Sequence, residues 1–192
     1  MKKIFFTLII ILNIITNASA EEIKRIIVGN KDAKISIIAF ESLTCSHCAD
    51  FHKKIYPQLK NEYIDTGLAK IEFRHFPLDI AAFNASKISQ CKNDGESNIL
   101  NLLFLNQQKW VKGSTAEEKN ENLKTFLVEE GIDVDFEQCI NNEKIEDFVL
   151  NDRIDGVKKF RVNATPTIII NNEKFEKSLN YKNLKKALEK LI

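Results

Sequence analysis

The sequence predicts an α/β fold interrupted by a helical insertion, and three observations lead to this expectation. Two strand-like segments and a helical pattern precede a third strand near the start of the 192-residue chain. Roughly 80 residues without strand character follow, enough for a small domain of their own. Strand character then returns, followed by a final amphipathic helix. This order of elements is typical of an α/β core that a helical insertion interrupts.

The first three strands are expected at 25–28, 35–40 and 69–76. The segment 35–40 is apolar almost throughout, as expected for a strand that is covered on both faces. In 69–76 apolar and charged residues alternate, so Ile71 and Phe73 share one face. Between these strands, the residues from about 45 to 61 carry apolar side chains at helical spacing. Proline removes a backbone donor, so Pro57 is expected to kink this helix.

The insertion is predicted to consist of helices only. Thr115 and Glu118 have the spacing of a capping box, which opens a helix that Gly131 closes. The other helices are expected at 81–90, 98–109, a short segment around Cys139, and about 144–159.

The C-terminal part returns to the sheet. A strand is expected at 167–170, and Asn171-Asn172 is a plausible tight turn into a second strand at 174–176. Asn180 is then expected to cap the last amphipathic helix.

The first twenty residues have the pattern of a secretory signal peptide, 1–20, cleaved after Ala20. Lys2 and Lys3 precede an apolar run, and small residues precede the cleavage site. An uncleaved membrane anchor is the alternative, but the apolar run is shorter than the roughly 20 residues that span a bilayer. We therefore expect an exported protein whose mature chain begins at Glu21.

Four cysteines follow the predicted cleavage site, and export would bring them into an oxidising compartment. Four cysteines allow three disulfide connectivities. The close spacing of Cys45 and Cys48 makes them natural partners, which leaves Cys91 with Cys139. Two free buried thiols are the alternative. The formal net charge of +1 gives no indication of nucleic-acid binding.

Cys45-Ser46-His47-Cys48 lies between a strand and a helix start, where redox chemistry is favoured. Unpaired N–H groups and the helix dipole stabilise a thiolate there, so Cys45 is predicted to be the nucleophile. Cys48, within the helix, is the expected resolving thiol. A hydrogen bond or positive charge from His47 would stabilise the thiolate and make the disulfide more oxidising. The hydroxyl of Ser46 is a further modulating group.

Other interpretations of these residues are possible. Cys-x-x-Cys can be half of a zinc site, but Cys91 and Cys139 do not form a second close pair. A purely structural disulfide would gain little, because a two-residue loop restricts little chain entropy. His52 is expected to be a partly exposed helix residue rather than a catalyst, and His75 is expected to be structural.

A second signal is Thr165-Pro166, directly before the strand at 167–170, although an ordinary loop proline would look the same. Together with the dithiol and the strand order, it gives the chain a clear resemblance to the DsbA family of thiol:disulfide oxidoreductases in the thioredoxin superfamily. The segments that carry the resemblance are 41–52, 136–139 and 162–167.

This resemblance implies a thioredoxin fold, formed by 21–77 and 161–192, with an inserted helical domain at 78–160. It implies that Pro166 is cis and faces the Cys45–Cys48 pair, and that the backbone of Thr165 binds substrate polypeptide. It also implies a periplasmic location and reoxidation by a membrane partner of the DsbB type. Some similar proteins carry a second disulfide in the insertion, which supports a structural bond between Cys91 and Cys139.

The chain departs from the family at two positions. Ser46 stands where proline is usual, which leaves the redox potential open. The superfamily often carries a buried acid six residues before the first cysteine, and that position is Ala39 here. Glu41 lies two residues later and hence on the same strand face. It is either a proton-transfer group or an exposed side chain.

The expected function is therefore a monomeric periplasmic oxidase, without cofactor or metal, that donates its Cys45–Cys48 disulfide to reduced exported polypeptides. A disulfide reductase or isomerase is the first alternative. A dithiol metal-binding protein is the second.

Overall fold

The computed structural model describes residues 22–192, so the predicted signal peptide lies outside the described residues. Within residues 22–192, no helix combines the length and the apolar character needed to cross a bilayer.

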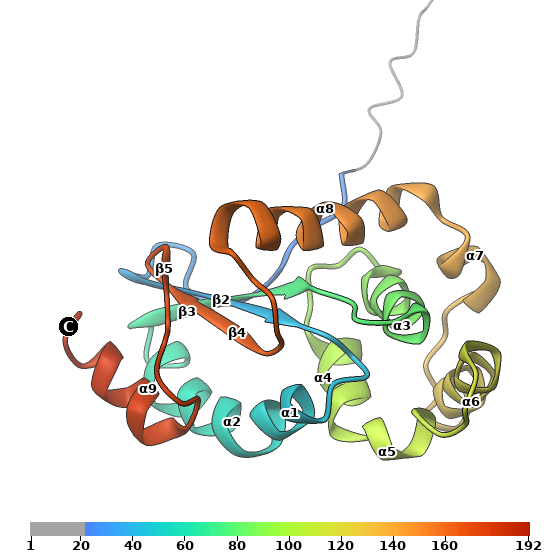
Figure 1. Cartoon of the computed structure of the whole chain (residues 1–192), viewed down its shortest axis with the longest axis horizontal. Helices are drawn as coiled ribbons and strands as arrows, with labels where there is room; N and C mark the ends of the chain where they lie inside the picture. Colours follow the sequence, from blue (N-terminus) through green and yellow to red (C-terminus); the bar gives the residue numbers. More distant parts are fainter. Residues whose placement is uncertain (1–21) are drawn as a thin grey trace, which may run out of the picture.

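A five-stranded sheet forms the centre of the molecule, with strand order β1-β3-β2-β4-β5 (Figure 1). The central pair β2 and β3 is parallel, and every other pair is antiparallel. The strands are β1 (Ile26–Gly29), β2 (Ile35–Glu41), β3 (Ala69–His75), β4 (Thr167–Ile170) and β5 (Glu173–Lys174). The turn between β4 and β5 uses Asn171 and Asn172 at positive φ, 47° and 70°. Asparagine tolerates this left-handed backbone better than most residues, so the predicted turn is confirmed.

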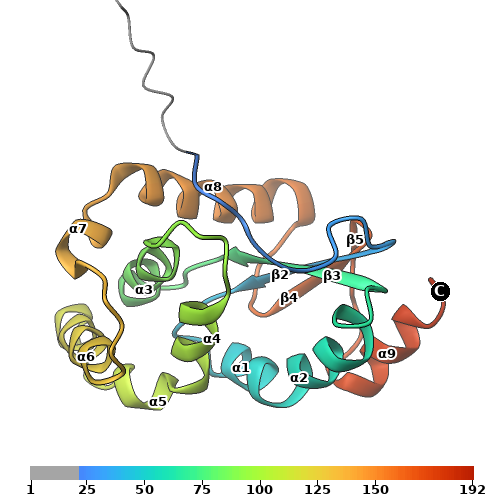
Figure 2. The ribbon, with the colours of Figure 1, turned by 180° about the vertical axis from the view of Figure 1, so that it is seen from behind.

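Helices cover both faces of the sheet. One face carries α1 (Ser46–Asp50), α2 (Tyr56–Leu59) and α9 (Tyr181–Leu188), whereas α8 (Glu143–Phe160) runs along the other, as both views show (Figures 1 and 2). The remaining helices gather at one end of the sheet. They are α3 (Ile80–Gln90), α4 (Asn98–Leu105), α5 (Gln107–Trp110), α6 (Ala116–Glu129) and α7 (Phe136–Ile140).

The observed architecture confirms the predicted fold class, since every element between β3 and β4 is a helix. The capping box of Thr115 and Glu118 opens α6 as predicted. The predicted helix 98–109 is instead two helices, α4 and α5, which Asn106 separates. The boundaries of the helical domain at 78 and 160 stay a prediction.

The helix after Cys45 continues to Ile64 and contains two wider π-helical turns, η1 (Phe51–Ile55) and η2 (Lys60–Ile64). At the end of η1 the N–H of Tyr56 donates to the carbonyl of Phe51, five residues earlier. Pro57 follows directly, in the first turn of α2. Because proline has no N–H, the helix does not continue its regular bonding through this point. The predicted disturbance at Pro57 therefore takes the form of a π-helical turn, a feature that often occurs at functional sites.

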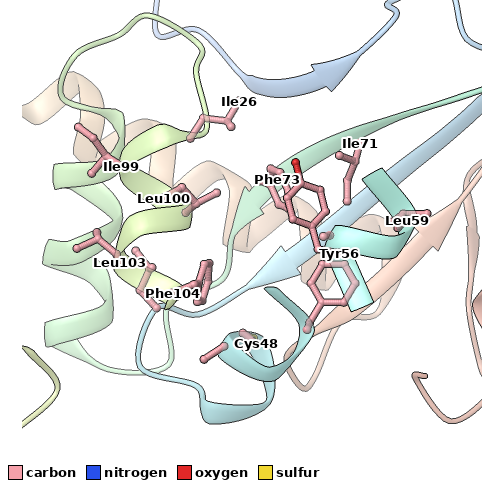
Figure 3. Packing of buried hydrophobic residues seen from close by; sticks show 14 of the residues in the cluster. Ile26, Cys48, Tyr56, Leu59, Ile71, Phe73, Ile99, Leu100, Leu103 and Phe104 are labelled. Carbon is pink, nitrogen blue, oxygen red and sulfur yellow. The ribbon is translucent and has the colours of Figure 1, made fainter. Parts of the chain in front are cut away.

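The strand β2 is buried on both faces, which explains its continuous apolar sequence. Ile37 and Ala39 belong to the large hydrophobic cluster that α1, α2 and α9 cover. Ile38 and Phe40 belong to a smaller cluster on the other face. Figure 3 shows part of the large cluster, where side chains of β3 and α2 meet those of α4. The labelled members from these elements are Tyr56, Leu59, Ile71, Phe73, Ile99, Leu100, Leu103 and Phe104.

Gly156 allows α8 to approach the smaller cluster closely. A Cβ atom at this position would lie 2.9 Å from Cε1 of Phe40 and 3.2 Å from Cδ2 of Phe76. We expect Gly156→Ala to lower the free energy of unfolding by about 1 kcal/mol. The overpacking costs about 1–3 kcal/mol, and the helix propensity of alanine offsets about 1 kcal/mol of it. Urea unfolding would measure this, with Asn151→Ala on the exposed face of α8 as control. Equal stability of the two variants would contradict the prediction.

Candidate active site

The dithiol lies where β2 leaves the sheet and α1 begins. Cys45 is the N-cap of α1, with φ −78° and ψ 119°, and its carbonyl accepts from the N–H groups of Cys48 and Ala49 at 3.1 and 3.2 Å. Its side chain is half-buried, whereas Cys48 is fully buried. Both are free thiols in this structure, which therefore represents the reduced form.

The environment separates the pKa values of the two thiols. A hydrogen bond from the Cys48 thiol is the largest of several effects that lower the pKa of Cys45 to about 5, against the opposing effect of partial burial. Thr165 and the backbone N–H groups of Cys48 and His47 contribute in the same direction. Burial raises the pKa of Cys48 far above its ordinary range. A reactive thiolate therefore stands in front of a protonated, protected thiol.

The segment Thr165-Pro166 lies opposite Cys45. Its peptide bond is cis, as the resemblance implies. Sγ of Cys45 lies 3.4 Å from the carbonyl oxygen of Thr165 and donates to it in the thiol form. The hydroxyl of Thr165 is buried and has no partner among residues 22–192, so it is free to donate to the thiolate. Two segments about 120 residues apart in the sequence thus meet at one sulfur atom.

The side chains of Ser46 and His47 are exposed. His47 contributes its backbone N–H to the Cys45 thiolate, but the hydrogen bonds of the described residues include none from its imidazole. The ring instead lines a groove of about 560 Å³ beside the dithiol, together with Thr165, Pro166 and residues of the helix after Cys48. The expected hydrogen bond from the imidazole to the thiolate is therefore absent from this arrangement.

Glu41 and His52 lie together inside the protein. β2 extends to Glu41, whose side chain is buried, so the interpretation of Glu41 as an exposed residue is wrong. Nε2 of His52 lies 2.9 Å from Oε2 of Glu41. The expectation that His52 is partly exposed is also wrong, because only 2% of the residue is accessible. The sequence contained one signal that His52 is buried. His52 follows Cys48 by four residues, and this spacing places both side chains on one helix face.

The loop that carries Cys45 is held by residues of the helical insertion. Nε2 of Gln107 donates to the carbonyl oxygens of Leu43 and Cys45 at 2.8 and 3.0 Å. Oγ1 of Thr44 donates to Oδ2 of Asp79 at 2.9 Å. Nothing in the sequence near Gln107 or Asp79 indicates these contacts, because the partners are 35 to 64 residues apart.

His75 has the structural surroundings that the sequence predicts. It is buried at the end of β3, its N–H donates to Oδ2 of Asp152, and its Nε2 pairs with the side-chain amide of Gln90. Burial lowers the pKa of His75 to about 3, so the ring is neutral. Asp152 also forms an ion pair with Arg25, which fixes the segment before β1 to α8.

Cys91 and Cys139 form a disulfide, with their Cα atoms 5.5 Å apart, and the predicted pairing is confirmed. The bond joins the end of α3 to α7, within the helical insertion. These two sulfur atoms are therefore not available as metal ligands alongside Cys45 and Cys48.

Comparison with known proteins identifies the family. A family model described as thioredoxin matches residues 21–190. The curated relatives include a Rickettsia conorii protein named as a protein-disulfide oxidoreductase, 29% identical over 76% of this chain and 52% of that relative. Disulfide bond formation protein D of Bacillus subtilis is 25% identical over 85% of this chain and 75% of the relative. The chain spans about half to two thirds of the length of the first curated relatives it matches.

Solved structures extend this similarity to three dimensions. The crystal structure of Wolbachia pipientis alpha-DsbA1 aligns with a TM-score of 0.77 and 30% identity, covering 87% of this chain and 90% of the other. BdbD from Bacillus subtilis, at 23% identity and a TM-score of 0.70, shares the fold. The family-model match and the 30% identity across nearly the whole of alpha-DsbA1 place this chain in the thioredoxin superfamily, as a member of the DsbA family.

Proposed function

We propose that this protein is a periplasmic thiol:disulfide oxidoreductase that donates a Cys45–Cys48 disulfide to newly exported proteins. The observation that carries the proposal is the contrast between the two thiols at the start of α1. Cys45 is half-exposed with a pKa of about 5, and Cys48 is buried and protonated. A thiolate this stable is a good leaving group and favours the reduced enzyme, which makes the disulfide oxidising.

In the proposed reaction, a substrate thiolate attacks Sγ of Cys45 in the oxidised enzyme. The Cys45–Cys48 bond breaks, a mixed disulfide forms at Cys45, and Cys48 leaves with the electron pair and takes up a proton. A second substrate thiolate then attacks the substrate sulfur of the mixed disulfide and releases Cys45 as a thiolate. The substrate gains a disulfide and loses two electrons, which the enzyme dithiol now holds.

Several neighbouring residues have proposed roles in this step. The backbone of Thr165, next to cis-Pro166, would pair with the extended substrate beside Cys45. His47 would contact the substrate through the groove that it lines, and Ser46 would tune the reactivity of the neighbouring thiolate. A membrane oxidase of the DsbB type would restore the disulfide. The predicted signal peptide supports export to the periplasm.

The test is to mix the oxidised protein with a reduced peptide that carries two cysteines and to follow the loss of peptide thiols. We expect stoichiometric peptide oxidation, and a glutathione equilibrium closer to the DsbA potential of about −120 mV than to the thioredoxin potential of about −270 mV. When the peptide is supplied in its disulfide form, the Cys45 thiolate of Cys48→Ser should attack it, release one peptide thiolate and hold the peptide as a mixed disulfide that mass spectrometry detects. Cys45→Ser should form no such adduct. A potential near the thioredoxin value would favour the reductase alternative and contradict an oxidase.

A further inference from the structure

The helical insertion binds three consecutive residues at the start of the dithiol motif. Nε2 of Gln107 donates to the carbonyl oxygens of Leu43 and Cys45 at 2.8 and 3.0 Å. Between these two residues, Oγ1 of Thr44 donates to the carboxylate of Asp79 at 2.9 Å. Of these contacts, the one from Gln107 reaches the backbone of the reactive cysteine itself.

The orientation of the Gln107 amide follows from its partners. Both partners are carbonyl oxygens, which only accept hydrogen bonds, so the NH2 group rather than the amide oxygen must face the loop. The two hydrogens of this group serve the two carbonyl oxygens. Gln107 is only 7% exposed, so water competes little for these bonds. One side chain therefore holds the loop on both sides of Thr44.

A buried tryptophan anchors α5, the short helix that carries Gln107. Trp110 is fully buried, and its Nε1 donates to the carbonyl oxygen of Leu103 at 2.9 Å. Gln107 precedes Trp110 by three residues and so lies on the same face of α5, whereas Gln108 is exposed. The helix α5 lies beside the start of α1 (Figure 1). The insertion thus presents the Gln107 amide from a fixed position.

The backbone conformation that Gln107 holds is the one that stabilises the Cys45 thiolate. An N-cap residue has an extended backbone, and its side chain faces the N–H groups of the second and third helical residues. Cys45 has this backbone, and these N–H groups belong to His47 and Cys48, which help to lower the pKa of Cys45. Rotation about ψ of Cys45 would redirect its carbonyl and also change the distance from its sulfur to these N–H groups. The contact with Gln107 and the contacts of the thiolate are therefore coupled.

Gln107 is neutral, so its contribution differs in kind from that of the charged groups around the dithiol. A neutral replacement leaves those groups in place, and a changed pH profile of Cys45 would then report the lost hydrogen bonds. The ionisable side chains on the elements around Cys45 are Glu41 at the end of β2, His47 and Cys48 in α1, and Asp79 before α3.

We propose that Gln107 is a positioning residue for disulfide exchange, which holds the backbone of Cys45 so that its sulfur faces the first turn of α1 when it is released as a thiolate. The proposal rests on the proposed function. In that reaction the bond between the substrate sulfur and Sγ of Cys45 breaks, and Sγ keeps the electron pair. Gln107 acts through the Cys45 backbone and takes no part in the exchange of bonds. The helical insertion thereby contributes to the oxidising strength of the dithiol.

The test replaces Gln107 by methionine, which has a similar length but donates no hydrogen bond. In Gln107→Met we expect the midpoint pH for alkylation of Cys45 by iodoacetamide to rise by at least about 0.5 unit. The equilibrium with glutathione should shift at least about threefold toward the oxidised enzyme, because a less stable thiolate makes the disulfide less oxidising.

Matched variants separate positioning from a general structural role. Gln108→Met makes the same change on the exposed side of α5 and should match wild type. Gln90→Met removes a buried glutamine that pairs with His75, so it should lower stability without moving the midpoint pH of Cys45. Thr44→Val removes the other contact of the loop and should shift the midpoint less than Gln107→Met. A wild-type midpoint in Gln107→Met, or an equal shift in Gln90→Met or Thr44→Val, would overturn the proposal.

The wild-type protein gives a readout that needs no variant. Nitrogen NMR should show the side-chain NH2 hydrogens of Gln107 exchanging with water much more slowly than those of the exposed Gln108, in both redox states. Equal exchange rates for the two side chains would overturn the proposal even if Gln107→Met does not fold. A wild-type protein that oxidises no peptide would instead contradict the proposed function, whatever the behaviour of Gln107.

Discussion

The reduced protein is expected to react with iodoacetamide at Cys45 with a half-maximal rate near pH 5. The Cys48 thiol, Thr165 and two backbone N–H groups lower the pKa of Cys45 to about 5, more than three units below the value of about 8.5 for a free cysteine. At pH 5 the thiolate fraction therefore exceeds that of a free cysteine by roughly a thousandfold. Mass spectrometry of samples quenched between pH 3 and 9 would locate the modified cysteine.

The control for this experiment changes the hydrogen bond from Cys48, which is the largest single cause of the lowered pKa of Cys45. Cys48→Ala removes the donor to the Cys45 thiolate and should move the pH profile of Cys45 upward. Cys48→Ser retains a hydroxyl donor and should move it less. A wild-type profile centred near pH 8.5 would contradict the interpretation of Cys45 as a stabilised thiolate.

The same pKa shift links stability to pH. A group whose pKa is lower in the folded protein stabilises it fully above the unfolded value, and this stabilisation is lost as the pH falls through the folded value. For Cys45 the window lies between about pH 8.5 and about 5. Only the reduced protein has this thiolate. As the pH falls through this window, the reduced form should therefore lose stability relative to the oxidised form. Urea unfolding of both forms at several pH values would measure the difference.

Removal of the Cys91–Cys139 disulfide is expected to lower the free energy of unfolding by about 2–4 kcal/mol. The bond closes a loop with a sequence separation of 48 residues, and restriction of such a loop in the unfolded chain accounts for a cost of this size. Urea unfolding of a Cys91→Ala/Cys139→Ala variant would measure it. Cys139 is buried, so its replacement also removes packing. The wild-type protein with the Cys91–Cys139 bond reduced keeps the packing of both side chains. It is therefore the matched comparison.

The disulfide lies apart from the dithiol, so the same variant should retain the pH profile of Cys45. A change in the free energy of unfolding below about 0.5 kcal/mol would show that this bond contributes little to the stability of the protein. A shifted Cys45 profile would show that the insertion disulfide acts on the active site, which its position between α3 and α7 does not predict.

The sequence predicted those features that depend on local patterns. The apolar run of β2 and the alternation in β3 identified the strands, and the positions of Thr115 and Asn180 identified two helix starts. The dithiol was evident because its chemistry depends on a spacing of three residues. Pattern analysis failed where burial depends on distant partners. His52 looked like an exposed helix residue because Glu41, Asn101 and Phe104, which surround it, lie 11 to 52 residues away.

The helix break at Asn106 shows the same limit. The apolar residues of 98–109 continue at helical spacing, so the pattern predicts one helix. The break separates α4, which contacts His52 through Asn101, from α5, which holds the Cys45 loop through Gln107. The break at Asn106 and the placement of α4 and α5 depend on tertiary contacts. A periodic pattern in the sequence does not indicate such contacts.

The Cys91–Cys139 bond also has a consequence for the biogenesis of the protein. A freshly synthesised chain carries four thiols, so its maturation to the described state requires the removal of two electrons by an external acceptor. Formation of the Cys45–Cys48 disulfide, which gives the fully oxidised protein, requires the removal of two more electrons. A protein proposed to oxidise other exported chains is thus itself a client of that chemistry, and mature copies would be suitable donors for the insertion disulfide of new ones. The yield of this disulfide in the cell would then depend on the copies that have already matured.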